Sequence, residues 1–323
     1  MAQPKKKFTL PFARWLLLLP IPAVWCILSH FGYLDYFENR TMDWRFRARG
    51  EITAPIKIIY VNVDSKSLDD IGNFPWSRHF FARVSDALVN AAKVRAVGFD
   101  FLLSPIGPPQ IANKNMLREG DLEIAKFLFG GPPVVFAASY SAEEFRAAEG
   151  RMRTRSLPLI ASDPRPPSDF EPPEVTAFEA GPAGSWSPPF IGLIDTYFGG
   201  TRTVPVWVPT NTRPYFHEAL ELARLYWGLP VGSIKPFDDR IDFVRPDGSV
   251  RATIPLRDRQ LVDINWFSPW ISSQNPRISF SKVYTYAEML ASDKAQERKT
   301  AQEFFAQDDW RDAVVLVGPV DPL

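Results

Sequence analysis

The sequence predicts an α/β fold, with a mixed, mainly parallel sheet carrying helices on both faces, preceded by one transmembrane helix. Strand-like and helix-like segments alternate from residue 56 onward, which is typical of parallel strands joined by right-handed crossovers. The predicted strands are short apolar runs rich in β-branched residues, as expected for strands buried on both faces. A separate apolar run near the N-terminus has about the length needed to cross a bilayer.

The predicted membrane segment covers residues 12–34 and follows a lysine-containing stretch, 1–11. Pro20 and Pro22 lie in its middle, where membrane helices tolerate proline better than soluble helices do. A cleavable signal peptide is the alternative, but no small-x-small cleavage site follows the apolar core, which favours a retained anchor. Basic residues flank both ends, so the positive-inside rule does not settle the orientation.

Composition excludes several classes of function. The 37 basic and 37 acidic residues cancel, whereas a nucleic-acid binder needs a basic surface to displace counterions from phosphates. Cys26 is the single cysteine, so no internal disulfide can form. With only three histidines besides, the usual zinc-ligand spacings are also excluded.

The first part of the soluble region predicts three strands separated by two helices. Ser77 is a suitable N-cap for the first helix, and Phe80, Val84 and Leu88 recur at helical spacing along its inner face. The predicted elements, in order, are strand 56–63, helix 78–92, strand 96–101, helix 121–129 and strand 134–138.

A proline-rich segment, about 141–189, interrupts this alternation. It has no sustained hydrophobic period, so it predicts a long surface loop or insertion.

Regular patterns return after residue 190. Pro214 is placed to open a helix, and Pro246-Asp247-Gly248 is a turn signal between two short strands, which together predict a hairpin. The predicted elements are strands 191–196 and 203–208, helix 215–227, hairpin strands 241–244 and 252–255, strand 261–265, helix 282–291 capped by Ser281, charged helix 294–306 and strand 313–317.

Three aspartates follow apolar runs and are candidate site residues: Asp64, Asp100 and Asp321. The carboxyl ends of strands in an open parallel sheet face a common crevice, where ligands bind. Three carboxylates there could hold magnesium or calcium. The alternative is that Asp64 and Asp100 cap helices or fix loops and that Asp321 lies in a turn, which we favour because caps are more common. We therefore predict no metal and no cofactor.

A second candidate group lies at the start of helix 78–92. Trp76 and Arg78, beside His79, could bind an anionic ligand together with exposed backbone N–H groups. The alternative is that Trp76 is a packing lid and Arg78 pairs with Asp69 or Asp70. The sequence favours neither interpretation.

No catalytic constellation is recognisable in the sequence. No serine lies in a GxSxG elbow, and Gly199-Gly200-Thr201 lacks the lysine of a P-loop. His217 is a lone histidine in a predicted helix, where it is more often structural or exposed than catalytic. The aromatic cluster Trp266, Phe267 and Trp270 indicates either a ligand groove, an interface or a cover over a sheet edge, and we prefer the last.

Five sequence pieces, in order and spacing, resemble the second type of CHASE domain, a sensory module found in front of cyclases, histidine kinases and Ser/Thr kinases. The resemblance covers most of 35–323 except the proline-rich insertion. Residues 197–201 depart from it, because they lack the aspartate-rich turn the family often has. The pieces are DWRFR (43–47), IYVNVDSKSLDDIGNFPWSR (59–78), AVGFDFLLSP (96–105), DGSVRATIPL (247–256) and VVLVGPVDPL (314–323).

The resemblance implies that 35–323 is the extracytoplasmic, periplasmic signal-input domain of a transmembrane receptor, with no enzymatic activity. Residues 12–34 would be its single-pass anchor in the cell inner membrane, 1–11 would be cytoplasmic, and a cyclase or kinase would supply the output. We expect a homodimer through the residue 12–48 helix and an unknown small-molecule or protein signal. No second apolar run long enough to span follows residue 34, so we expect either a fragment or a stand-alone sensor whose partner supplies the output.

Two other functions are also compatible with the sequence. One is a membrane-tethered α/β hydrolytic enzyme that uses Asp64 and Asp100. The other is an envelope interaction or structural protein that binds other envelope proteins through the proline-rich loop and the aromatic cluster.

Overall fold

The computed structural model describes residues 20–30, 35–73, 76–100, 123–124, 126–128, 131–138, 191–194, 203–209, 214–257 and 259–320. The chain divides into two compact units, 1–52 and 53–323. The first contains helices α2 (Pro20–His30) and α3 (Asp35–Arg49). Within the described residues, no helix combines the length and the apolar composition needed to cross a bilayer. The predicted span, 12–34, lies partly outside those residues.

The second unit is built on a six-stranded sheet in which every neighbouring pair of strands is parallel. The order is β12-β1-β13-β2-β3-β4, so β13, the last strand in sequence, lies between β1 and β2. The predicted α/β class with a mainly parallel sheet is confirmed. The strands are β1 (Ile58–Val63), β2 (Ala96–Phe99), β3 (Val134–Ala138), β4 (Ile191–Leu193), β12 (Arg277–Ser279) and β13 (Val314–Pro319).

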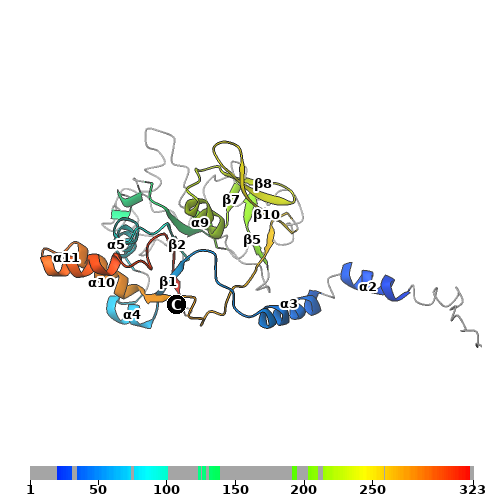
Figure 1. The fold of residues 1–323 in the computed structure, drawn as a ribbon, viewed down its shortest axis with the longest axis horizontal. Coiled ribbons are helices and arrows are strands. Elements are labelled where there is room, and N and C mark those ends of the chain that lie inside the picture. The colour runs from blue at the N-terminus through cyan, green and yellow to red at the C-terminus, as the bar shows by residue number, and fades with distance from the viewer. Residues whose placement is uncertain are drawn as a thin grey trace, which may run out of the picture. The chain divides into compact units, whose positions relative to one another are not determined.

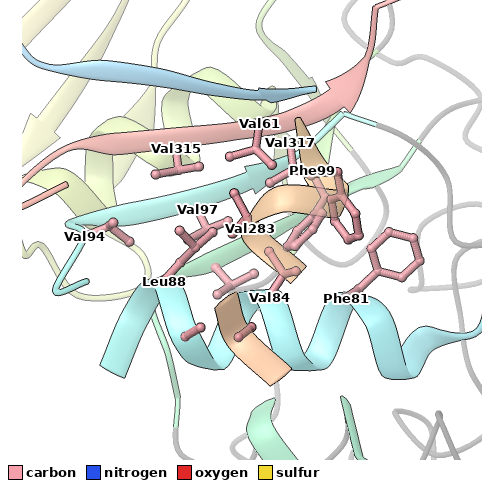
Figure 2. Packing of buried hydrophobic residues seen from close by; sticks show 14 of the residues in the cluster. Val61, Phe81, Val84, Leu88, Val94, Val97, Phe99, Val283, Val315 and Val317 are labelled. Atoms are coloured by element: carbon pink, nitrogen blue, oxygen red, sulfur yellow. The ribbon is translucent and has the colours of Figure 1, made fainter. Parts of the chain in front are cut away.

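One face of the sheet carries the main hydrophobic core. Figure 2 shows Val61, Val97 and Val315 from the strands meeting Leu88 and Val283 from the helices that cover this face. These helices lie together on one side of β1 and β2 in Figure 1. They are α4 (Ser65–Ile71), α5 (Arg78–Asp86) with the π-helical turn η1 (Ala87–Ala91) that follows it, α10 (Phe280–Leu290) and α11 (Ala295–Phe305).

The opposite face is only partly covered. Helix α9 (Glu218–Tyr226) packs there over β2, β3 and β4, with Leu222 against Ala96 and Val135. Strand β1 alternates between the two faces: Ile59 and Val61 are buried in the main core, while Ile58 and Tyr60 on the other face are half-buried. The part of the sheet beside α9 therefore borders an open space.

Three small sheets complete the unit. The predicted hairpin is confirmed: β9 and β10 pair antiparallel, and Gly248 has a φ of +82° in the turn between them. The small sheets are β10-β9-β8, β11-β5 and β6-β7. Their strands are β5 (Thr203–Pro205), β6 (Trp207–Pro209), β7 (Pro214–Phe216), β8 (Ile234–Pro236), β9 (Arg240–Val244), β10 (Val250–Pro255) and β11 (Leu261–Asp263).

The helix predicted to begin at residue 215 begins later. Tyr215 and Phe216 belong to β7, which pairs antiparallel with β6. The backbone N–H of His217 donates to the Val206 carbonyl at 2.8 Å, and His217 is then the N-cap of α9. Pairing with a neighbouring strand thus overrides the local signal of Pro214. Helix α10 likewise begins at Phe280, with Ser279 rather than Ser281 as its N-cap.

The other predicted boundaries agree to within a few residues, and some predictions are untested. The predicted strand 203–208 is divided into β5 and β6, and the predicted helix 78–92 becomes α5 followed by η1. Residues 123–124 and 126–128 of the predicted helix 121–129 are helical. The proline-rich insertion, 141–189, lies outside the described residues.

Candidate functional site

A cavity of about 840 Å³ lies on the sheet face that carries α9. Its walls come from β1 and β13, from α9, and from the segment between β11 and β12 that contains Trp270. Most of these walls are apolar or aromatic, and the polar groups are few. The lining residues are Pro55, Ile56, Ile58, Tyr60, Asn62, Asp100, Ile194, His217, Glu218, Ala219, Leu222, Ala223, Tyr226, Trp227, Trp270, Val314, Leu316, Gly318, Pro319 and Val320.

Two glycines allow the first turn of α9 to lie directly on the sheet. A Cβ atom at Gly192 on β4 would collide with the backbone of Glu218, and one at Gly98 on β2 would collide with its carboxyl oxygen Oε1. The start of the helix is also fixed to β4 by a parallel bridge between His217 and Leu193. The fold therefore holds the Glu218 carboxyl against the middle of the sheet.

Glu218 is a buried acid with an unpaired carboxyl oxygen. The residue is 5% exposed, and Oε1 has no hydrogen-bond partner among the described residues. Desolvation by burial and, as a smaller contribution, the charge of Asp100 together raise the pKa of Glu218 to about 8. Glu218 is therefore mostly protonated at neutral pH.

Asp100 directly follows β2, and its backbone N–H donates to the Val317 carbonyl at 2.8 Å. Asp100 lines the cavity and is an exposed residue, but its carboxyl group is partly desolvated by the surrounding protein, which raises its pKa. Gly318 on β13 leaves room for it, since a Cβ there would lie 3.3 Å from the Asp100 Cβ. The cavity thus has two acids, Asp100 and Glu218, at one end.

His217 is half-buried at the same end. Its Nδ1 accepts a hydrogen bond from the Ala219 backbone N–H at 3.1 Å, so the proton of the neutral ring lies on Nε2. Burial lowers the pKa of His217 to about 4, so the ring is neutral at pH 7. It adds a hydrogen-bond donor to the cavity and no positive charge.

Of the sequence-predicted site residues, Asp100 lines the cavity and Asp64 does not. Asp64 is the N-cap of α4: its Oδ1 accepts from the Ser67 N–H at 2.9 Å, the Ser67 hydroxyl at 2.7 Å and the Ser279 hydroxyl at 2.8 Å. Burial acts to raise the pKa of Asp64, but these hydrogen bonds outweigh it and lower the pKa below its usual value. This carboxylate joins the N-terminal ends of α4 and α10.

Trp76 and Arg78 also lie away from the cavity. Trp76 is part of the main core, where its ring packs on Phe81 and Phe280 and its Nε1 donates to the Gly72 carbonyl at 2.7 Å. Arg78 is the first residue of α5 and is 4% exposed. Asp321 lies outside the described residues. The structure therefore does not bring Asp64, Trp76 or Arg78 to one site with Asp100.

No cluster of three or more His, Cys, Asp or Glu side chains that could hold a metal occurs in the described part of the chain. Chemically, the cavity offers a polar, acidic end and a long apolar wall. Such a site can bind and orient a ligand by hydrogen bonds and burial of apolar surface.

The sequence interpretation missed Glu218. A signal was present, because Glu218, Leu222 and Leu225 share one face at i, i+4 and i+7 spacing, so an acid lies on a face that is otherwise apolar. Nothing in the sequence indicated that Gly98 and Gly192 lie beneath that acid, since this depends on the sheet order.

Comparison with known proteins gives one family match. The model of the CHASE2 domain matches residues 20–323. No curated protein and no solved structure matches the chain significantly. CHASE2 domains are sensory and non-catalytic. Because the match covers nearly the whole chain, the protein belongs to the CHASE2 domain family.

Proposed function

We propose that the chain is the extracytoplasmic signal-input domain of a transmembrane receptor, and that its signal binds in the α9 cavity. Residues 12–34 anchor it in the cell inner membrane, and a cytoplasmic cyclase or kinase supplies the output. Membership of a sensory family supports this proposal. The observation that carries it is the cavity itself, a mostly apolar space of about 840 Å³ lined by the buried acid Glu218, whose Oε1 has no hydrogen-bond partner among the described residues.

The position of the cavity suits a sensor. It lies between the rigid central sheet and two attached elements, α9 and the segment around Trp270. The Trp270 ring lies edge-on to Tyr60 of β1, with 4.7 Å between ring centroids. A ligand that contacts the sheet, α9 and Trp270 together stabilises one spacing of these elements over another. Such differential affinity is what a ligand needs in order to shift a conformational equilibrium.

Fusion of alkaline phosphatase, which is active only after export, to the end of the full chain tests the location. We expect activity from the fusion and none after deletion of residues 1–34. An inactive fusion of the intact chain, with activity of a cytoplasmic reporter at the same position, would overturn the proposed location.

Blocking the cavity tests its role. Ala219 is an exposed residue of the lining, so Ala219→Phe adds a ring to the cavity without disturbing the core. We expect this variant to lose the response of the coupled output, while Ala295→Phe, on helix α11 outside the cavity and also exposed, keeps it. A normal response with the cavity blocked would show that the signal enters elsewhere.

Dimerisation through the residue 12–48 helix is part of the same proposal. Cysteines introduced at Leu34 or Phe37 in a Cys26→Ser background should cross-link two copies in membranes. Failure to cross-link at every position of that helix face would refute the dimer.

A further inference from the structure

We propose that the cavity binds an organic cation, a ligand with a primary ammonium group attached to an apolar or aromatic body. The ammonium group lies between Glu218 and Asp100, and the body lies along the apolar wall. This inference rests on the proposed function, because it takes the cavity to be the signal-binding site.

The charge of the lining supports a cation. The described lining contains two acids, Asp100 and Glu218, and no lysine or arginine. His217 is the third titratable group at that end, and it is neutral at pH 7. The described side chains that line the cavity therefore offer acidic groups and no lysine or arginine.

The buried carboxyl supports a polar partner at this end. Glu218 lines the cavity, its side chain is 5% exposed, and Oε1 has no hydrogen-bond partner among the described residues. A buried polar group left unpaired is destabilising, so a ligand that pairs with it is favoured. An ammonium group has three N–H donors and no acceptor, so it can serve both acids at once.

The walls support an apolar body. Tyr60, Leu222, Tyr226 and Leu316 line the space beyond the acids. The cavity of about 840 Å³ lies within the range of roughly 300–1,000 Å³ typical of small-molecule sites. The lining ring of Trp227 already contacts a cation, since the guanidinium carbon of Arg251 lies 5.1 Å from its centroid.

A simple metal ion and an anion fit less well. A metal needs several oxygen ligands at once, whereas the described residues contain no group of three acidic, His or Cys side chains, and the walls are apolar. An anion would meet Asp100 with no lysine or arginine of the described lining to offset the repulsion.

Binding of an ammonium group to Glu218 involves a defined proton transfer. The ligand arrives as R–NH₃⁺, the protonated Glu218 carboxyl releases its proton to the buffer, and the carboxylate pairs with the unchanged ammonium. With the pKa of Glu218 at about 8 in the free protein, roughly nine-tenths of a proton is released per ligand at pH 7. A neutral ligand, which leaves the Glu218 proton in place, releases none.

Isothermal titration calorimetry of the full chain with three indoles tests the inference. Tryptamine, tryptophol and indole-3-propionate share one ring and carry an ammonium, a hydroxyl and a carboxylate. Titration at pH 7 in phosphate and in Tris, which differ in ionisation enthalpy, gives the number of protons released. We expect tryptamine to bind at least tenfold more tightly than the other two, with release of close to one proton.

Two variants complete the test. Glu218→Gln keeps the shape of the side chain but cannot ionise, so tryptamine should bind at least tenfold more weakly and release no proton. Glu303→Gln, on the exposed face of α11, is the matched control and should bind as the unmodified chain does. Three outcomes would each contradict the proposal that the cavity binds an organic cation. They are equal or tighter binding of tryptophol or indole-3-propionate, tryptamine binding without proton release, and no tryptamine binding at millimolar concentration.

These experiments distinguish an error in the ligand class from an error in the proposed function. If tryptophol binds and Ala219→Phe abolishes that binding, the cavity is a ligand site and only the ligand class is wrong. If the output still responds with the cavity blocked, the proposed function itself is wrong.

Discussion

Replacing Glu218 by glutamine should make the ligand-free protein more stable at neutral pH. The acid is 5% exposed beneath α9, and folding raises its pKa from 4.5 to about 8. Because the folded state holds the proton more tightly than the unfolded state, stability falls as pH rises from 4.5 to about 8 and is level above that. Glutamine does not titrate, so the variant lacks this loss.

The magnitude follows from the two pKa values. A difference of one pKa unit corresponds to about 1.4 kcal/mol between the two protonation states. At pH 7 the unfolded chain is ionised at this residue while the folded chain is largely protonated, so Glu218→Gln should gain about 3 kcal/mol. The gain should approach zero near pH 4 and reach about 5 kcal/mol at pH 9.

Urea denaturation of the full chain, followed by tryptophan fluorescence between pH 4 and pH 9, measures this gain. The control is Glu303→Gln, whose exposed side chain lies 3.9 Å from Lys299 and whose removal should change stability by less than about 0.5 kcal/mol. A gain that does not depend on pH, or a loss of stability at pH 7, would refute the account of Glu218 as a desolvated, unpartnered acid.

Three further predictions concern the stability of the fold. Asp64→Ala removes three hydrogen bonds to one carboxylate oxygen at the start of α4 and should lower the free energy of unfolding at pH 7 by about 2 kcal/mol, measured by urea denaturation. Because folding lowers the pKa of Asp64, this stability is present above pH 3.8 and is lost as the pH falls below that value. An unchanged urea midpoint at pH 7 would contradict the prediction. Gly192→Ala places a Cβ against the backbone of Glu218 and should lower the stability of the fold by about 3 kcal/mol. Gly98→Ala places a Cβ against side-chain atoms, which can shift, and should lower the stability by about 1 kcal/mol. The reverse order in thermal melts would contradict the described packing of α9 on the sheet. Trp310→Ala empties a fully buried position in the main core and should cost about 3–5 kcal/mol, and a loss below 1 kcal/mol would show that this side chain is not packed as described.

The stability and binding predictions for Glu218 have opposite signs. The same substitution is expected to stabilise the empty protein and to weaken binding of a cation. Residues that cost stability and serve a ligand are typical of functional sites.

The central strands could be predicted because their signal is local. β1, β2, β3 and β13 are apolar, β-branched runs, and Ser77 marks the start of α5 by its capping side chain, which accepts from the His79 N–H. Both signals depend on neighbouring residues alone, so they can be recognised without knowledge of the rest of the fold.

Elements that depend on distant partners were missed or misplaced. β12 has three residues and is a strand because Tyr60 and Val61 of β1 pair with it. Residues 215–216 have a helical hydrophobic pattern, yet β6 draws them into a strand. Their structure is decided by pairing across the chain, which overrides local propensity.

The candidate site was predicted only in part. Asp100 was found because strand ends in a parallel sheet face a crevice, and it does line the cavity. The same rule also pointed to Asp64, which instead accepts hydrogen bonds from Ser67 of α4 and from Ser279, the N-cap of α10. Glu218 was missed because its role depends on two glycines on other strands.

The place of β13 in the sheet has a consequence for how the molecule is made. β1 and β2 do not pair with each other; each pairs with β13, whose residues follow the end of β2 by more than 200 positions. Until β13 has been synthesised, the two halves of the sheet each expose an unsatisfied strand edge, which is prone to association with other chains. Contacts so distant in sequence also slow folding. The domain therefore acquires its native centre only once β13 has been synthesised, and the emerging polypeptide depends on being kept apart from its neighbours until then.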